Sequence, residues 1–168
     1  MTHVVCNSGP LMALGKLNRL PLLQQLYHEV HITTEVYRET VEAGISKGFP
    51  DALVIKLFWE RQDWPVITVT PEQWAVFVPN VILDPGEVET IAYALSLPSS
   101  LVLLDDEQAR QEARRQGLTV HGTLGVLVEA YRREVLTYPE VERLLMEIAV
   151  RPDIWISARL CQQILSQL

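Results

Sequence analysis

The feature that most constrains the fold is an alternation of short apolar runs with segments whose apolar residues recur at helical spacing. The runs that we interpret as strands are HVVC, EVHI, PVITV, SLVLL and LTVH. VVC and SLVLL are continuous rather than alternating in their apolar residues, as expected for strands that are buried on both faces. Strands separated by helices in this way pair in parallel through crossover units. The pattern therefore predicts an α/β fold, a three-layer α/β/α sandwich with a mainly parallel central sheet.

The connecting segments complete this organisation, and we expect one domain over residues 1–168. Helices are expected over 10–19, 50–62 and 106–116, and two or more helices over about 138–168. Two further helices are expected to begin after a cap at Thr33 or Thr34 and at Pro85. The segment at about 45–80 is the least regular and is interpreted as an irregular or helical insertion, mobile or facing a partner. The C-terminal stripe of Ile156, Leu160, Ile164 and Leu168 either covers the core or forms a partner surface.

Polar side chains follow two of the predicted strands at the point where each strand ends. Asn7 follows HVVC, and Asp105 and Asp106 follow SLVLL. In open parallel sheets, ligands bind beyond the carboxyl ends of the strands, where the strand order reverses. We therefore expect these two strand ends to contribute to one ligand site.

Two further acids are selected by their helical phase. Glu39 lies nearest the stripe formed by Val36, Thr40 and Ala43, and Glu87 borders the apolar face one turn before Ile91. Acids at the edge of a buried face are costly unless a positive charge meets them. A divalent cation turns the mutual repulsion of such carboxylates into attraction, and oxygen ligands favour Mg²⁺ or Mn²⁺ over zinc.

Each of these residues also has a purely structural interpretation. Asp105 or Asp106 forms a capping-box pattern with Gln108 and would then only cap a helix. Glu87 in a first helical turn is favoured by the helix dipole. Glu39 alone reads as a surface residue, and Asn7 as a partner for backbone groups at a strand end. Only their joint placement favours a metal site.

Composition limits the remaining possibilities. A chain of 168 residues with 48% hydrophobic residues is large enough for one real core. The net charge of −7 argues against a protein that coats nucleic acid or an anionic membrane, but not against an acidic metal site. Cys6 and Cys161 are too few and too scattered for a disulfide framework or a zinc site. Without a signal sequence or a spanning segment, the expected protein is soluble and cytoplasmic, with no membrane partner.

Four segments in register resemble PIN-like nuclease domains, most closely a prokaryotic branch related to toxins of toxin–antitoxin pairs. They are VVCNSGPLMALGKLNRLPLLQQL, ITTEVYRETVEAG, LDPGEVETIAYAL and LVLLDDEQARQEARRQGLTVHGTLGVLVEAYRREVL, and they cover most of the chain from Val4 to Leu136. The resemblance implies an endoribonuclease that cleaves single-stranded RNA with Mg²⁺ or Mn²⁺. It also implies a small antitoxin protein and a homodimer as partners.

The resemblance assigns the metal site to Asn7, Glu39, Glu87 and Asp105, with Asp106 as an adjacent catalytic candidate. Two positions depart from the family's pattern. Asn7 stands where the family has an Asp, and the segment HGTLG offers only the Thr123 oxygen where many members have a further acid. Asn7 keeps an oxygen ligand but removes one negative charge, which weakens metal binding and the activation of water. The alternative to an enzyme is therefore a catalytically weak PIN-like fold that binds RNA or a protein.

Weaker signals concern contacts to the RNA and the aromatic residues. We consider Ser8, Lys16, Arg19, Arg110, Arg114 and Thr123 as RNA contacts. For Arg110 and Arg114, ordinary pairing with Glu107 and Gln111 on one helix is the stronger interpretation. The residues Trp59, Trp64, Trp74 and Trp155 are expected to anchor the core or an interface rather than to stack on bases. His28 and His31 lack a third ligand for zinc.

Overall fold

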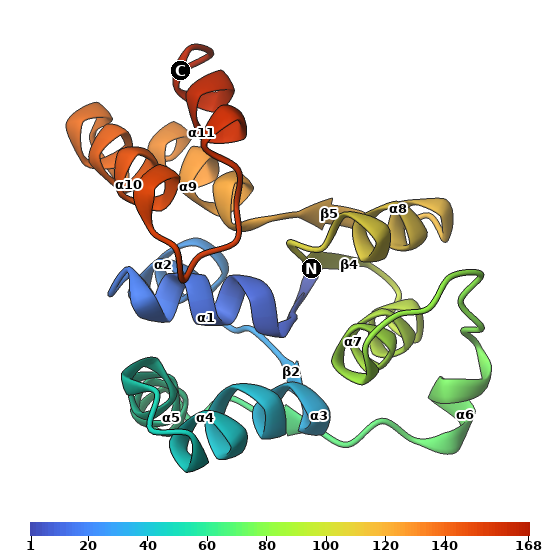
Figure 1. The fold of residues 1–168 in the computed structure, drawn as a ribbon. Helices are drawn as coiled ribbons and strands as arrows, with labels where there is room; N and C mark the ends of the chain where they lie inside the picture. Colours follow the sequence, from blue (N-terminus) through green and yellow to red (C-terminus); the bar gives the residue numbers. More distant parts are fainter.

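The computed structural model describes residues 1–168 (Figure 1). The strands are β1 (His3–Cys6), β2 (Ile32–Thr33), β3 (Val66–Ile67), β4 (Ser100–Leu103) and β5 (Thr119–His121). The helices are α1 (Ser8–Lys16), α2 (Pro21–Tyr27), α3 (Thr34–Tyr37), the π-helical η1 (Arg38–Glu42), α4 (Ala43–Ser46), α5 (Pro50–Gln62), α6 (Pro71–Ala75), α7 (Pro85–Leu95), α8 (Glu107–Arg115), α9 (Thr123–Arg132), α10 (Tyr138–Val150) and α11 (Ala158–Leu165). None of these helices is long and apolar enough to cross a bilayer.

All strand pairs are parallel. A three-stranded sheet has the order β1-β4-β5, and β2 pairs with β3 in a second sheet. A parallel bridge between Val5 and His31 joins the two, because the Cys6 amide donates to the His31 carbonyl at 2.9 Å and the His31 amide donates to the Val4 carbonyl at 2.8 Å. The strands thus lie in the order β3-β2-β1-β4-β5. The order reverses between β1 and β4, which is where a ligand site is expected.

Helices cover both faces of this sheet, so the predicted α/β/α sandwich is confirmed. Successive side chains of a strand point to opposite faces, and accordingly Val4 and Cys6 of β1 belong to the larger core cluster whereas Val5 belongs to the smaller one. Helices α1, α2, α5, α9 and α10 contribute to the larger cluster, and α7 and α8 to the smaller. Figure 1 shows α9, α10 and α11 gathered at one end of the molecule and α3, α4 and α5 at the other.

The helix after β2 contains a feature that its sequence does not predict. Its cap is Thr33, as expected, and the Thr33 side chain accepts a bond from the Val36 amide at 3.4 Å. After one turn, α3 continues without a break into η1 and α4. Such wider π turns occur frequently at functional sites, and Glu39 lies in this one.

The segment at 45–80 contributes to the core. Helix α5 occupies 50–62, as predicted, and packs against α1 with Ile55 and Trp59 buried. The predicted strand PVITV is reduced to β3, which pairs with β2. In the C-terminal stripe, Ile156, Ile164 and Leu168 pack against the core, whereas Leu160 is exposed.

The four tryptophans divide into two groups. Trp59 and Trp64 are buried and pack edge to face, with ring centroids 5.1 Å apart. Trp74 is partly exposed, and the side chain of Trp155 is 94% exposed. Of the two expected roles, Trp155 therefore does not anchor the core, because it presents its indole ring to solvent.

Candidate functional site

The carboxyl ends of β1 and β4 lie side by side because the two strands are direct neighbours. Asn7 follows β1, and its backbone amide donates to the Leu103 carbonyl at 3.0 Å. Asp105 lies two residues beyond the end of β4. A Cβ atom on Gly9 would lie 3.3 Å from the Asp105 Cβ, so the first turn of α1 packs directly against this acid. The sheet thus brings together the two strand ends that the sequence singled out.

Asp105 is held by the start of α9. Its Oδ1 accepts a hydrogen bond from the Thr123 amide at 2.7 Å, and its Oδ2 accepts one from the Thr123 hydroxyl at 2.6 Å. Burial raises the pKa of Asp105, and the two bonds from Thr123 and the nearby charge of Arg110 oppose this increase. A side chain at Gly122 would collide with Arg110 and with Asp105, so glycine is needed there for close packing.

Glu39 joins three elements. Its Oε2 accepts a bond from the Ser8 hydroxyl at 2.5 Å, and its Oε1 accepts one from the Gly86 amide at 3.2 Å. The carboxylate of η1 therefore meets the first turns of α1 and α7. Burial raises the pKa of Glu39, while the bonds from Ser8 and Gly86 lower it.

Glu87 is almost completely buried, with 8% of its surface exposed. Its Oε2 accepts a hydrogen bond from the backbone amide of Asp84 at 2.9 Å. Asp84 is the N-cap of α7 and Glu87 is its N3 residue, so the two residues form a capping box. Burial raises the pKa of Glu87, and the negative charges of Asp106, Asp84 and Glu39 raise it further. Gly86, the residue before Glu87, donates its backbone amide to Glu39, so the start of α7 lies beside the Glu39 carboxylate.

Asn7 is the N-cap residue of α1, but its side chain makes no capping hydrogen bond to that helix. Its Oδ1 lies 3.3 Å from the Thr90 hydroxyl, which also donates to the Gly86 carbonyl at 2.7 Å. One hydroxyl proton serves both acceptors, so the longer contact to Asn7 is the weaker one. The amide oxygen of this buried residue therefore keeps acceptor capacity.

Asp106 has a structural role of its own. It is the N-cap of α8, and its Oδ1 accepts a bond from the Ala109 amide at 2.9 Å. The capping interpretation thus accounts for this residue, although its charge also acts on Glu87.

The residues considered as RNA contacts have varied positions. Thr123 is fully buried and Ser8 is half-buried, and both donate to carboxylates of the site. Arg110 donates to the Leu104 carbonyl at 3.2 Å and lies 3.9 Å from Glu107, as the pairing interpretation predicts. The Lys16 ammonium donates to the Asp153 carbonyl at 2.7 Å. Arg114 is exposed on α8. The Gln111 side chain does not pair with Arg114, because it donates to Glu107 instead.

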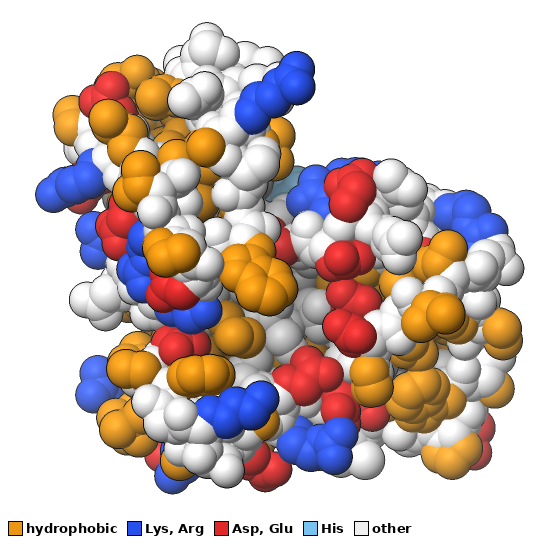
Figure 2. All heavy atoms as spheres, viewed as in Figure 1, with side chains coloured by type: hydrophobic (Ala, Val, Ile, Leu, Met, Phe, Trp, Pro, Cys, Tyr) orange, Lys and Arg blue, Asp and Glu red, His pale blue; other side chains and the backbone are white.

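Acidic side chains gather on one face of the molecule, in a band from α8 past α7 to α3 (Figure 2). No three Asp, Glu, His or Cys side chains lie close enough together to chelate one ion. Protein groups instead satisfy one or both oxygens of Glu39, Glu87 and Asp105. Because like charges repel, we expect these carboxylates to stay apart until a cation joins them.

Comparison with known proteins assigns the chain to a family. No curated protein matches the chain. A family model described as a PIN domain matches residues 3–168, which include both strand ends and both helix acids. The chain therefore belongs to the PIN domain family, whose members have a nuclease-type fold.

Proposed function

We propose that this PIN domain protein is an endoribonuclease that cleaves single-stranded RNA with the help of Mg²⁺ or Mn²⁺. The observation that carries the proposal is that the first turn of α1 contacts both Glu39, through Ser8, and Asp105, through Gly9, while Glu39 also binds Gly86, the residue before Glu87. Glu39 and Glu87 form no ion pair with any Lys or Arg. Partly buried acids without a cationic partner are costly to the fold, and such groups cluster at functional sites.

The donor set fits a hard divalent cation. Glu39, Glu87 and Asp105 offer carboxylate oxygens, Asn7 offers an amide oxygen, and no sulfur or imidazole ligand is present among them. A bound Mg²⁺ or Mn²⁺ would supply a Lewis acid that activates water and stabilises charge on a phosphate.

The protein's own residues have distinct tasks in this proposal. Glu39, Glu87, Asp105 and Asn7 hold the cation. Ser8 and Thr123 orient the carboxylates of Glu39 and Asp105, because a ligand fixed by a second hydrogen bond loses less entropy when it binds. Arg110 supplies positive charge beside Asp105, and Asp106 keeps α8 in place.

The choice of RNA as the substrate class follows from the family resemblance. The negative charge of the chain affects how RNA can bind. With a net charge of −7, the protein repels phosphates over long distances. We therefore expect binding of RNA to depend on the divalent cation at the site.

The direct test is to incubate the purified protein with unstructured RNA, with and without Mn²⁺, beside an Asp105→Asn variant. The proposal expects cleavage that requires Mn²⁺ and is lost in the variant. Equal cleavage by both proteins, or cleavage by neither, rejects the enzyme. An intact fold of the variant, shown by an unchanged circular dichroism spectrum, is the control.

A second candidate function is a PIN-like fold that binds RNA or protein without efficient catalysis. It is favoured by Asn7, which brings one carboxylate fewer to the site, and by the buried Thr123 in the segment where many members have an acid. An Asn7→Asp variant separates the two. A gain of cleavage in this variant over a feeble parent supports the binding module, whereas vigorous cleavage by the parent supports the enzyme.

We also propose the wider role that the family resemblance suggests, a cytoplasmic toxin paired with a small antitoxin. Growth arrest on expression of the wild type, but not of the Asp105→Asn variant, and its relief by a small protein encoded next to it would support this role. The proposed homodimer is tested by light scattering of the purified chain.

A further inference from the structure

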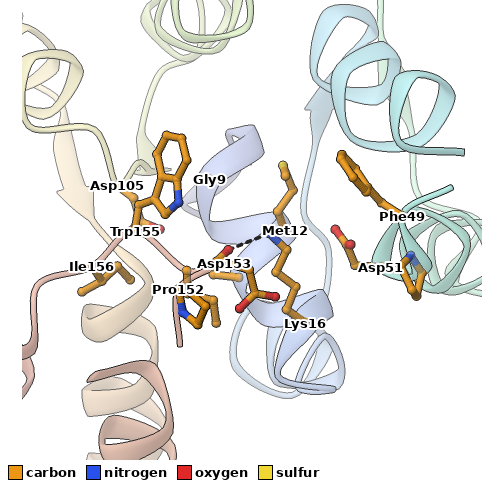
Figure 3. Close-up of a pocket in the computed structure, with 13 residues that line it drawn as sticks. Gly9, Met12, Lys16, Phe49, Asp51, Asp105, Pro152, Asp153, Trp155 and Ile156 are labelled. Atoms are coloured by element: carbon orange, nitrogen blue, oxygen red, sulfur yellow. Dashed lines mark hydrogen bonds between the residues drawn. The ribbon is translucent and has the colours of Figure 1, made fainter. Parts of the chain in front are cut away.

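A groove of about 620 Å³ begins at the acidic site and runs along α1 (Figure 3). Gly9 and Asp105 line the end that it shares with the site, and Met12 and Lys16 of α1 lie along its length. Phe49 and Asp51 lie on one side, and the segment 152–156 on the other. This volume is in the range of small-ligand sites, so the groove accepts a nucleotide-sized group rather than a folded domain.

Trp155 projects from the second wall, in the irregular segment between α10 and α11. Its neighbour Ile154 is buried with 5% exposed, and Ile156 packs against the core. With both neighbours directed inward, the indole ring between them is directed outward. Its exposure is therefore a consequence of the local backbone geometry.

A set of polar contacts clamps this segment onto α1. The Lys16 ammonium donates to the Asp153 carbonyl at 2.7 Å, and Arg151 donates to the Lys16 carbonyl at 2.9 Å. Arg151 also binds both carboxylate oxygens of Asp153, at 2.8 and 2.7 Å. This pairing holds the pKa of Asp153 at about 2. These contacts hold the backbone that leads to Trp155 in place, so a ligand that packs on the indole ring need not order this segment.

We infer that this groove is a subsite for an unpaired nucleobase of the RNA, with Trp155 as the stacking platform. The inference rests on the proposed function. Every base has a flat π face that stacks on an exposed indole ring, and such stacking tolerates any sequence. The groove also continues directly from Asp105, so a base held there belongs to a nucleotide next to the phosphate at the site.

The charges along the groove favour a base over a phosphate. Arg151 neutralises Asp153, so Lys16 is the remaining positive charge among the lining residues and is outnumbered by Asp51 and Asp105. Asp51 and Asp105 add negative charge to the walls. Phosphates are repelled from such walls, whereas an uncharged base is not. The phosphate is then expected at the acidic end, where a cation offsets the carboxylates.

The test measures binding of a fluorescein-labelled five-nucleotide RNA in Mg²⁺. A Glu87→Gln background prevents cleavage, and Glu87 does not line the groove. In this background, Trp155→Ala is expected to weaken binding roughly 5- to 150-fold, the range found for the loss of one base–aromatic stack. Trp155→Phe should retain most of the affinity. Trp74→Ala is the matched control, because Trp74 is partly exposed on α6 outside the groove.

Two further measurements separate this inference from the proposed function. The indole N–H signal of Trp155, assigned by its loss in Trp155→Phe, should shift when the RNA is added. An oligomer of the same length without bases should bind the Trp155→Ala variant and its parent equally.

The outcomes are distinct. If the wild type cleaves RNA but Trp155→Ala binds it unchanged, the subsite is rejected and the nuclease stands. If the wild type neither cleaves nor binds RNA, both are rejected. Binding of a basic peptide that shifts the Trp155 signal, with no shift on addition of RNA, assigns the groove to a protein partner and rejects the subsite.

Discussion

Thr123 donates hydrogen bonds to both carboxylate oxygens of Asp105, through its amide at 2.7 Å and its hydroxyl at 2.6 Å. The two residues lie at the ends of neighbouring strands, Asp105 beyond β4 and Thr123 beyond β5. The contact thus fixes the orientation of the acid that follows β4.

Loss of the Thr123 hydroxyl should weaken the site without moving the backbone. In Thr123→Val, the amide bond to Asp105 remains but the hydroxyl bond is lost, so kcat/KM for RNA cleavage should fall about 10-fold. Because the lost bond lowers the pKa of Asp105, the acidic limb of the pH profile should also move to higher pH. Thr123→Ser keeps the hydroxyl and should restore both. An unchanged pH profile in Thr123→Val would contradict the orienting role.

Cleavage should increase with pH from the acidic side. Burial raises the pKa values of Glu39, Glu87 and Asp105 above their ordinary values. Protons compete with the cation for these oxygens, so the affinity for Mn²⁺ should fall as the pH drops through the raised pKa values. Titration of Mn²⁺ at pH 5 and at pH 7.5 measures this effect. Equal affinity at both values would exclude these acids as the ligands.

Ser8→Ala offers a separate test on Glu39. The bond from Ser8 lowers the pKa of Glu39, so its removal should raise this pKa and shift the acidic limb to higher pH. Ser8→Thr retains a hydroxyl and serves as the control. Activity that falls equally at all pH values would instead indicate that Ser8 acts on the substrate.

Glu87→Gln should stabilise the cation-free protein at neutral pH. A carboxyl group whose pKa is raised by folding binds a proton more tightly in the folded state than in the unfolded state. As the pH rises from the pKa of the unfolded state through the pKa of the folded state, such a group therefore lowers the stability of the protein. Gln removes this cost and still offers an oxygen to the Asp84 amide, which Glu87 binds at 2.9 Å. We expect a gain of about 1 kcal/mol in the free energy of unfolding, measured with urea and EDTA at pH 7.5.

The same variant should respond less to metal. A ligand that binds only the folded state raises the Tm, so Mn²⁺ should raise the Tm of the wild type more than that of Glu87→Gln. An equal increase in both would mean that Glu87 is not a ligand.

Gly86→Ala should impair activity more than stability. A Cβ on Gly86 would lie 2.6 Å from Oε2 of Glu39, so the flexible carboxylate must move away. A displacement of this size at a reacting site costs up to about 100-fold in rate. Gly44→Ala is the contrast, because its Cβ would lie 2.5 Å from the Ala52 Cβ on a packed helix. That variant should lose about 1–3 kcal/mol of stability. Thermal unfolding and cleavage assays on both variants test this distinction.

Local features of the sequence were sufficient to predict the fold class and the four main candidates. The continuous apolar runs identified β1 and β4, and the parallel-sheet rule then placed Asn7 and Asp105 at adjoining strand ends. Helical phase distinguished the buried Glu87 from the less buried Glu89 and Glu39 from the exposed Glu42, because burial of one helix face repeats every 3.6 residues, but Glu35 is half-buried like Glu39. These inferences need only the residues of one element at a time.

The contacts that complete the site depend on several elements at once. Ser8 meets Glu39 across 31 positions of sequence, Gly86 meets Glu39 across 47, and Thr123 meets Asp105 across 18. The π turn at Glu39 and the exposure of Trp155 likewise leave no periodic signal. By itself, the sequence determined which segments become strands and helices and which of their faces are buried, since periodicity is a local property of the chain. Only the tertiary structure decided which donor meets which carboxylate, because that depends on how separate elements pack against one another.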